Sequence, residues 1–248
     1  MRFIKVKDIH ELSEVFAHEM LKHIYTNKER VNIAITTGTT PIEGYKILGP
    51  QIKGKRFLDN VHYYIFDEFW YKDDKVGICR EALDRKFFQY TDVKEENIHN
   101  LMPGSETGYD EKLARDGGLD MICMGIGTNG HFCGNQPGTF STWDEGTHAI
   151  DGHCTPVVEQ LLVDLLHNNL HSDDESRIPD HYISMGPKTV MSAKHLVIIL
   201  SGENKAEIAE KMFFGPIDVD CPASIFQLHQ DVTVIIDEAA ASRIKDRI

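Results

Sequence analysis

The sequence contains no apolar run of the roughly 20 residues that a membrane-spanning helix requires. Its first residues, MRFIKVKDIHELSEVF, mix charged with apolar side chains and lack the continuous apolar core of a signal peptide. We therefore expect a cytoplasmic protein without a membrane-bound segment.

Cysteine is scarce and scattered. The five cysteines are odd in number and no two of them form a CxxC pair; they are Cys79, Cys123, Cys133, Cys154 and Cys221. This pattern argues against a disulfide framework and against a zinc knuckle, and it predicts reduced thiols. His18-Glu19 also fails the metalloprotease pattern H-E-x-x-H, because the next histidine is His23, one position too late. The sequence predicts no metal site.

Positive charge is in short supply. The chain has 26 Lys and Arg against 39 Asp and Glu, which gives a net charge of −13 and a pI near 5.4. Such a surface repels nucleic-acid backbones and anionic lipid, so neither is expected as a partner. An anionic small molecule is still compatible with this balance where a few local groups overcome the overall field.

The 248 residues, 41% of them hydrophobic, are enough for one sizeable core, and residues 1–248 are predicted to form a single domain. An amphipathic helix is expected over the first 28 residues, with apolar side chains at helical spacing from Ile9 to Ile24. Short apolar strands are expected at 31–35, 61–66, 119–124, 181–185, 196–200 and 232–236, with helices after Pro41, over 77–89 and after Ser105.

Short apolar strands that alternate with helices are typical of a parallel sheet covered on both faces. The predicted fold class is therefore α/β, a three-layer α/β/α arrangement around a mostly parallel, Rossmann-like sheet. In such sheets ligands bind at the carboxyl ends of the strands. The polar residues described next follow predicted strands, so we expect them to gather at that edge.

The loop Thr36-Thr-Gly-Thr-Thr-Pro41 lies between a predicted strand and a predicted helix. Helix-terminal N–H groups, threonine hydroxyls and the close backbone approach that Gly38 allows would suit an anion. The loop lacks the Gly-Lys-Ser/Thr ending of a P-loop, so a nucleoside triphosphate is disfavoured. The alternative interpretation is a threonine-rich helix cap without a ligand.

Asp67 follows the strand Val61–Phe66 and is expected at the mouth of the sheet. Partial desolvation there would raise the basicity of its carboxylate, which suits removal of a proton next to a carbonyl group. The alternative is an aspartate that caps a turn or a helix, which is the commoner role of a lone Asp.

A glycine-rich loop, Gly125-Ile-Gly-Thr-Asn-Gly-His131-Phe-Cys-Gly-Asn-Gln-Pro137, follows the strand at 119–124. Its glycines match the dinucleotide pattern G-x-G-x-x-G, but three features argue against that function. The loop follows a third strand, Gly134 and Pro137 prevent a long helix, and no acidic residue ends a strand about 20 positions later. We expect instead a donor-rich loop that presents His131, and no nucleotide cofactor.

Lys205 lies in Ser201-Gly-Glu-Asn-Lys205, directly after the strand that ends at Leu200. A lysine in the first turn of a helix opposes the helix dipole, so an anionic ligand would explain its position. An exposed lysine without a ligand is the alternative.

Together these segments resemble the hexosamine-phosphate isomerase/deaminase family, which includes glucosamine-6-phosphate deaminases and galactosamine-6-phosphate isomerases and shares its fold with 6-phosphogluconolactonases. The resemblance extends over nearly the whole chain, through TTGTTP, FDEFW, GGLDMICMGIGTNGHFCGNQP, SGENKA and CPASIFQLH. FDEFW and the asparagine before Gly130-His131 are more similar to the galactosamine branch.

The resemblance implies a phosphorylated amino sugar as substrate, no cofactor, and a chain that is compatible with a homo-oligomer. The substrate would contact Thr37, Gly38, Thr39, Thr40, Gly125 and Lys205. His131, with Asn129 and Gln136 beside it, would assist opening of the pyranose ring. Asp67 would then move a proton between C2 and C1, which gives an enolamine and, after loss of ammonia, a ketose 6-phosphate.

Two departures from the family pattern stand out. The family usually has D-G-H and N-E-P where this chain has Asn129 and Gln136, so neutral amides replace two carboxylates and the pKa of His131 should be lower than in the family. The family's phosphate-binding arginine is also missing, with an aliphatic residue near Leu161, and Arg177 is a candidate substitute. Two alternatives therefore stay open: a 6-phosphogluconolactonase-like hydrolase, and a catalytically weakened sugar-phosphate-binding regulatory protein.

Overall fold

The computed structural model describes all residues from Met1 to Ile248. Its strands are β1 (Arg2–Val6), β2 (Val31–Ile35), β3 (Val61–Ile65), β4 (Asp67–Glu68), β5 (Ile98–His99), β6 (Met121–Gly125), β7 (His148–Asp151), β8 (His181–Ser184), β9 (Leu196–Leu200) and β10 (Val232–Asp237). Its α-helices are α1 (Ile9–Ile24), α2 (Ile42–Ile52), α3 (Ile78–Lys86), α4 (Glu106–Arg115), α5 (Pro156–Leu170), α6 (Pro187–Met191) and α7 (Ala206–Phe214). Short 3₁₀ helices lie at Arg56–Leu58, Phe88–Tyr90, Glu95–Asn97, Glu175–Arg177, Glu203–Lys205 and Pro222–Leu228.

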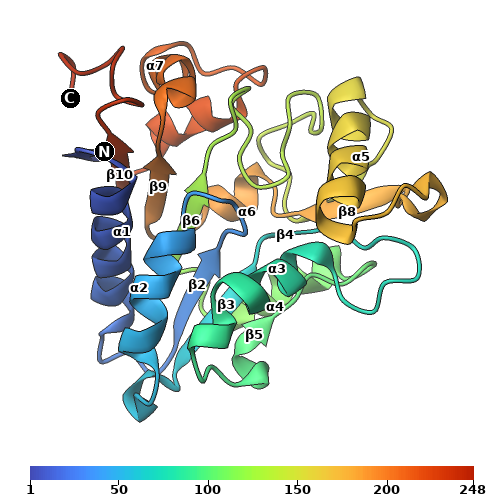
Figure 1. Cartoon of the computed structure of the whole chain (residues 1–248), viewed down its shortest axis with the longest axis horizontal. Coiled ribbons are helices and arrows are strands. Elements are labelled where there is room, and N and C mark those ends of the chain that lie inside the picture. Colours follow the sequence, from blue (N-terminus) through green and yellow to red (C-terminus); the bar gives the residue numbers. More distant parts are fainter.

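Seven strands form the main sheet in the order β1-β10-β9-β6-β2-β3-β5, and every neighbouring pair is parallel. Helices α1, α2 and α3 contribute to the apolar cluster on one face, while α4, α6 and α7 contribute to the cluster on the other (Figure 1). The predicted α/β class, with a three-layer arrangement and a mostly parallel Rossmann-like sheet, is confirmed.

Strand composition explains this layering. In β9, Val197 and Ile199 face one cluster whereas Leu196, Ile198 and Leu200 face the other. Because both faces are covered, all five residues of this strand are buried. Because both faces of these strands are buried, their sequences are continuous apolar runs, and such runs predict the strands.

Two expectations about the elements were wrong. The first 28 residues are not one helix, because Arg2–Val6 forms β1 and pairs with β10 before α1 begins at Ile9. The strand predicted at 181–185 exists as β8, but it pairs antiparallel with β4 and β7 in a separate three-stranded sheet. Its apolar residues Tyr182 and Ile183 are buried, as in the parallel strands, so composition alone does not reveal its partner.

The small sheet matters for the site because its edge strand β4 is the pair Asp67–Glu68. The chain leaves β3 at Ile65 and enters this second sheet after a single residue. Asp67 is thus held by backbone pairing with Ser184, at the carboxyl end of a main-sheet strand. No helix in the structure combines the length and the apolar character needed to cross a membrane.

Candidate active site

A cavity of about 460 Å³ opens at the carboxyl ends of the main-sheet strands. The residues that line it come from α5 and from the carboxyl ends of β2, β3, β6 and β9 with the loops that follow them; they are Thr36, Thr37, Gly38, Thr39, Thr40, Pro41, Phe66, Asp67, Phe69, Gly125, Ile126, Gly127, Thr128, His131, Cys133, Gly134, Gln136, Leu161, Leu165, Ile199 and Lys205. Of the site residues that the sequence predicted, all line this cavity except Asn129, which contacts the His131 ring, and Arg177, described below.

The loop Thr36–Pro41, called the threonine loop below, lines this cavity. Helix α2 begins directly after Pro41, and no side chain caps its N-terminus. The threonine hydroxyls are thus not used as a helix cap, which was the alternative interpretation of this loop. Free N–H groups at the start of an 11-residue helix, with threonine hydroxyls beside them, suit an anion.

Asp67 presents its carboxylate to the cavity from β4. The Cys79 thiol lies 3.4 Å from Asp67 Oδ1, and the Thr37 hydroxyl lies 3.7 Å from the Cys79 sulfur. Desolvation raises the pKa of Asp67 to about 6, and the thiol contact opposes this shift. A carboxylate with such a pKa is ionised at neutral pH and is still basic enough to accept a proton.

Glu68, next to Asp67, points the other way and is fully buried. Its carboxylate accepts hydrogen bonds from the backbone N–H groups of Phe69, Cys79 and Arg80, two of them in the first turn of α3. A Cβ at Gly77 would lie 2.1 Å from Glu68 Cδ, so only glycine admits this carboxylate. Glu68 thereby ties α3 to β4 and fixes the strand that carries Asp67.

On the side of the cavity that carries the His131 imidazole, the neighbouring polar side chains are the neutral amides of Asn129 and Gln136. Asn129 Oδ1 accepts a hydrogen bond from the backbone N–H of His131 at 3.2 Å and lies 2.7 Å from His131 Nδ1. Asn129 Nδ2 donates to Gln136 Oε1 at 2.7 Å. The backbone donor fixes the orientation of the Asn129 amide, since an N–H group requires an oxygen as its acceptor.

These amide contacts fix the tautomer of His131. Because Asn129 Oδ1 is an acceptor, Nδ1 carries the proton and Nε2 keeps its lone pair. Desolvation and the nearby charge of Lys205 lower the pKa of His131 to about 4, and only the amide of Gln136 acts in the opposite direction. A Cβ at Gly127 would lie 2.0 Å from Nδ1, so this glycine makes room for the ring instead of a nucleotide.

No helix opens between β6 and β7, as Gly134 and Pro137 indicated, so the glycine-rich loop lacks the helix N-terminus of the dinucleotide motif. The first long helix after β6 is α5, which follows β7.

Lys205 lies at the N-terminus of α7 and is the only lysine or arginine among the lining residues. Its ammonium group donates to the backbone oxygen of Ile126 at 2.6 Å, and desolvation lowers its pKa. Lys86, at the end of α3, donates to the backbone oxygen of Thr37 at 2.6 Å from outside the lining. These two ammonium groups supply positive charge close to the threonine loop.

Helix α5 covers the cavity with the apolar side chains of Leu161 and Leu165. Arg177, the candidate substitute for the missing arginine, lies elsewhere: it forms an ion pair with Asp74 and does not line the cavity. Arg177 is therefore not a substitute for that arginine, and no arginine lines the cavity.

Sequence reasoning did not assign roles to Glu68, Cys79 or Lys86. Glu68 adjoins Asp67, so a second carboxylate in FDEFW was a signal that could have been followed. Cys79 and Lys86 lie on α3, 12 and 19 positions beyond Asp67, and nothing in the local pattern marks them. Only the docking of α3 against β4 brings them to the site.

Fold and cavity together define a class: α/β proteins that hold a carboxylate, an imidazole and an ammonium group around a small cavity at the carboxyl edge of a parallel sheet. A family model described as "Glucosamine-6-phosphate isomerases/6-phosphogluconolactonase" matches residues 7–235. The chain belongs to this family, as its sequence motifs indicated.

Curated relatives support the assignment over the full length. The glucosamine-6-phosphate deaminase of Clostridium acetobutylicum is 31% identical over 253 residues, which cover 98% of this chain and 100% of that protein. The glucosamine-6-phosphate deaminase of Lysinibacillus sphaericus is 32% identical over 251 residues, which cover 95% of this chain and 98% of that protein.

Solved structures agree with the fold. A monomeric glucosamine-6-phosphate deaminase superposes with a TM-score of 0.80 at 28% identity, covering 98% of this chain and 100% of the other. A 6-phosphogluconolactonase from Trypanosoma cruzi superposes with a TM-score of 0.71 at 17% identity, covering 98% and 96%. The second likeness concerns the fold alone.

Proposed function

We propose that this chain, with residues 1–248 acting as one domain, is an amino-sugar-phosphate isomerase/deaminase. It would convert a hexosamine 6-phosphate and water into a ketose 6-phosphate and ammonia. One observation carries the proposal: Asp67, with its raised pKa, shares a cavity of about 460 Å³ with the neutral imidazole of His131 and the ammonium group of Lys205. Family membership supports the same reaction class.

In this proposal the phosphate binds between the threonine loop and Lys205. The N-terminus of α2 and the hydroxyls of Thr37, Thr39 and Thr40 supply donors, and Gly38 lets the ligand approach the backbone. Gly125, at the end of β6, leaves room for the sugar. Hydrogen bonds to charged groups contribute about 1.5–3 kcal/mol each, so one lysine with several neutral donors can hold a phosphate without an arginine.

His131 would open the sugar ring. Its Nε2 lone pair accepts the proton of the anomeric hydroxyl, and the same proton then passes to the ring oxygen. Asn129 and Gln136 hold the ring of His131 in the required tautomer. The imidazolium that forms in between has no carboxylate partner, so this step is expected to be slower than with an acidic relay.

Asp67 would carry out the isomerisation. Its carboxylate removes the C2 proton of the open-chain amino aldose and returns it to C1. The resulting imine at C2 reacts with water, and ammonia leaves. Positioned proton transfer of this kind contributes about 10²–10⁴ in rate and uses side chains alone, so the proposal includes no cofactor. We place the reaction in the cytoplasm, with a small phosphorylated sugar as the partner.

The test is an ammonia assay with glucosamine 6-phosphate and galactosamine 6-phosphate at high enzyme concentration. The proposal expects release from at least one epimer together with a stoichiometric ketose 6-phosphate. No release from either would overturn it. Hydrolysis of 6-phosphogluconolactone above the spontaneous rate, without ammonia release, would favour the hydrolase instead.

A second candidate function rests on the neutral amides beside His131 and on Leu161 and Leu165, the apolar side chains that α5 places in the lining. With amides at Asn129 and Gln136 and no arginine in the lining, the chain would be a regulatory protein that binds sugar phosphates but turns them over slowly. Comparison of the natural chain with Gln136→Glu distinguishes the two. Turnover only in the variant, with equal ligand binding in both, supports the binding protein; fast turnover by the natural chain excludes it.

A further inference from the structure

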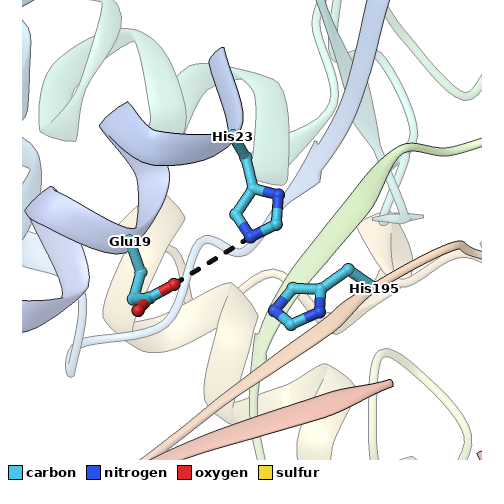
Figure 2. A group of neighbouring side chains, drawn as sticks. All are labelled: Glu19, His23 and His195. Atoms are coloured by element: carbon cyan, nitrogen blue, oxygen red, sulfur yellow. Dashed lines mark ion pairs between the residues drawn. The ribbon is translucent and has the colours of Figure 1, made fainter. Parts of the chain in front are cut away.

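A cluster of three metal-ligating side chains lies at the amino-terminal edge of the main sheet. Glu19 and His23 are one turn apart on α1, and His195 comes directly before β9. One potential ligand atom from each residue lies within 4.8 Å of the other two (Figure 2). The cluster is separate from the catalytic cavity, which is lined by Ile199 at the opposite end of β9.

Burial makes this cluster unusual. Glu19 is 7% exposed and His195 is 5% exposed, so both have lost most of their hydration. The Nε2 atoms of His23 and His195 are buried and have no hydrogen-bond partner. Leaving buried polar atoms unpaired destabilises a fold, so two such nitrogens beside one carboxylate need an explanation.

The orientation of His195 points to a ligand at Nε2. Asp231, directly before β10, places Oδ2 2.9 Å from His195 Nδ1, although the N–H is not aimed well enough at the oxygen to count as a hydrogen bond. A rotation of the ring would complete that bond. A carboxylate on one ring nitrogen and a metal on the other is the usual second-shell arrangement of metal-binding histidines.

We propose that Glu19, His23 and His195 form a binding site for a divalent transition metal, with Zn²⁺ as the best match. Two imidazoles and one carboxylate are a known zinc ligand set, and water would complete the tetrahedron. His23, with a side chain 21% exposed, provides the route to solvent. The ion would join the end of α1 to the start of β9.

The distances allow this with small movements. Ligand atoms about 2.0–2.1 Å from a tetrahedral ion lie roughly 3.3 Å apart. Glu19 Oε2 and His23 Nε2 are 4.0 Å apart, and the two rings are stacked with centroids at 4.4 Å and an angle of 25°. Metal binding would require the rings to rotate about their side-chain bonds, so that both lone pairs point to one position.

Two neighbouring cations oppose metal binding. Arg2 and Lys22 each lie 3.2 Å from an oxygen of Glu19. Their side chains are 57% and 58% exposed, so both can swing into solvent with little loss, since exposed ion pairs contribute little to stability.

The experiment is a calorimetric Zn²⁺ titration of the full-length chain after treatment with a chelator. The Cys154→Ser background removes the one exposed thiol that could bind zinc by itself. We expect one equivalent of Zn²⁺ per chain, at least tenfold weaker binding in His23→Gln, and unchanged binding in the control His18→Gln, an exposed neighbour on α1.

Three further measurements separate metal binding from misfolding and locate the ion. His23 is partly exposed, so His23→Gln should keep its circular dichroism spectrum and its metal-free melting temperature, whereas His195→Gln carries more risk. Crystals with Zn²⁺ should show an anomalous peak between the three side chains. Equal zinc affinity in His23→Gln and the parent, or no binding by the parent, would overturn the proposal and leave a metal-free pair of stacked imidazoles.

Discussion

The carboxylate side and the imidazole side of the cavity are buried in different ways. Burial raises the pKa of the Asp67 carboxyl group to about 6. The neighbouring carboxylate, Glu68, accepts hydrogen bonds from three backbone N–H groups. His131 faces amides only, and its pKa is about 4. In the proposed mechanism, proton removal therefore depends on Asp67, while Asn129 and Gln136 would fix the geometry of His131 without stabilising positive charge.

The largest effect is expected at Asp67 itself. Asp67→Asn removes the proton acceptor but keeps the shape, so kcat should fall by about 10²–10⁴ with little change in ligand binding. Ammonia release and equilibrium binding of the substrate measure the two quantities. A decrease in kcat of less than tenfold would show that Asp67 is not the base.

The same variant provides a pH test. The folded-state pKa of Asp67, about 6, is raised above its ordinary value of 3.8 by burial. The folded protein therefore holds the proton more strongly, and the natural chain loses stability relative to Asp67→Asn as pH rises through that window. Activity of the natural chain should rise over the acid limb near pH 6, where the carboxylate ionises. Urea unfolding and rate profiles at several pH values check both.

Gly77→Ala tests whether Glu68 supports the carboxylate side. The new Cβ displaces the Glu68 carboxylate from its three donors, which should cost about 2–3 kcal/mol and lower kcat through the movement of β4. Gly108→Ala on α4 is the matched control, because nothing lies within 4 Å of its new Cβ and alanine favours a helix. Equal stabilities of the two variants would contradict the role of Glu68.

Gln136→Glu sharpens the comparison from the imidazole side. A carboxylate at this position would accept the same hydrogen bond from Asn129 and should raise the pKa of His131 by about one unit. An NMR titration of the ring protons of His131 measures this. Gln230→Glu, which adds the same charge at an exposed site just before β10, at the opposite edge of the sheet, should leave that pKa unchanged.

The smallest effect is expected at Cys79. A serine hydroxyl is a stronger donor than a thiol, so Cys79→Ser should lower the pKa of Asp67 and move the acid limb of kcat/KM by a few tenths of a unit to lower pH. An unchanged limb would show that the thiol contact has no influence on the base.

Much of the fold could be predicted from the sequence because buried parallel strands are continuous apolar runs. The residues of the site could be predicted where they follow such strands, as Asp67, His131 and Lys205 do. β1 was missed because its five residues continue into a helical pattern without a break. Contacts between distant segments, such as Lys86 with Thr37 or His195 with His23, depend on packing that local patterns do not contain.

The pairing of β1 with β10 has a consequence for synthesis. β1 is an edge strand whose only neighbour in the sheet is formed by residues 232–237, near the end of the chain. During translation the first strand therefore finds its partner only after residues 232–237 have been made, with a loss of chain entropy when these distant segments meet. Removal of β10 should leave an exposed edge on β9 as well as an unpaired N-terminus, which favours aggregation over a smaller folded core.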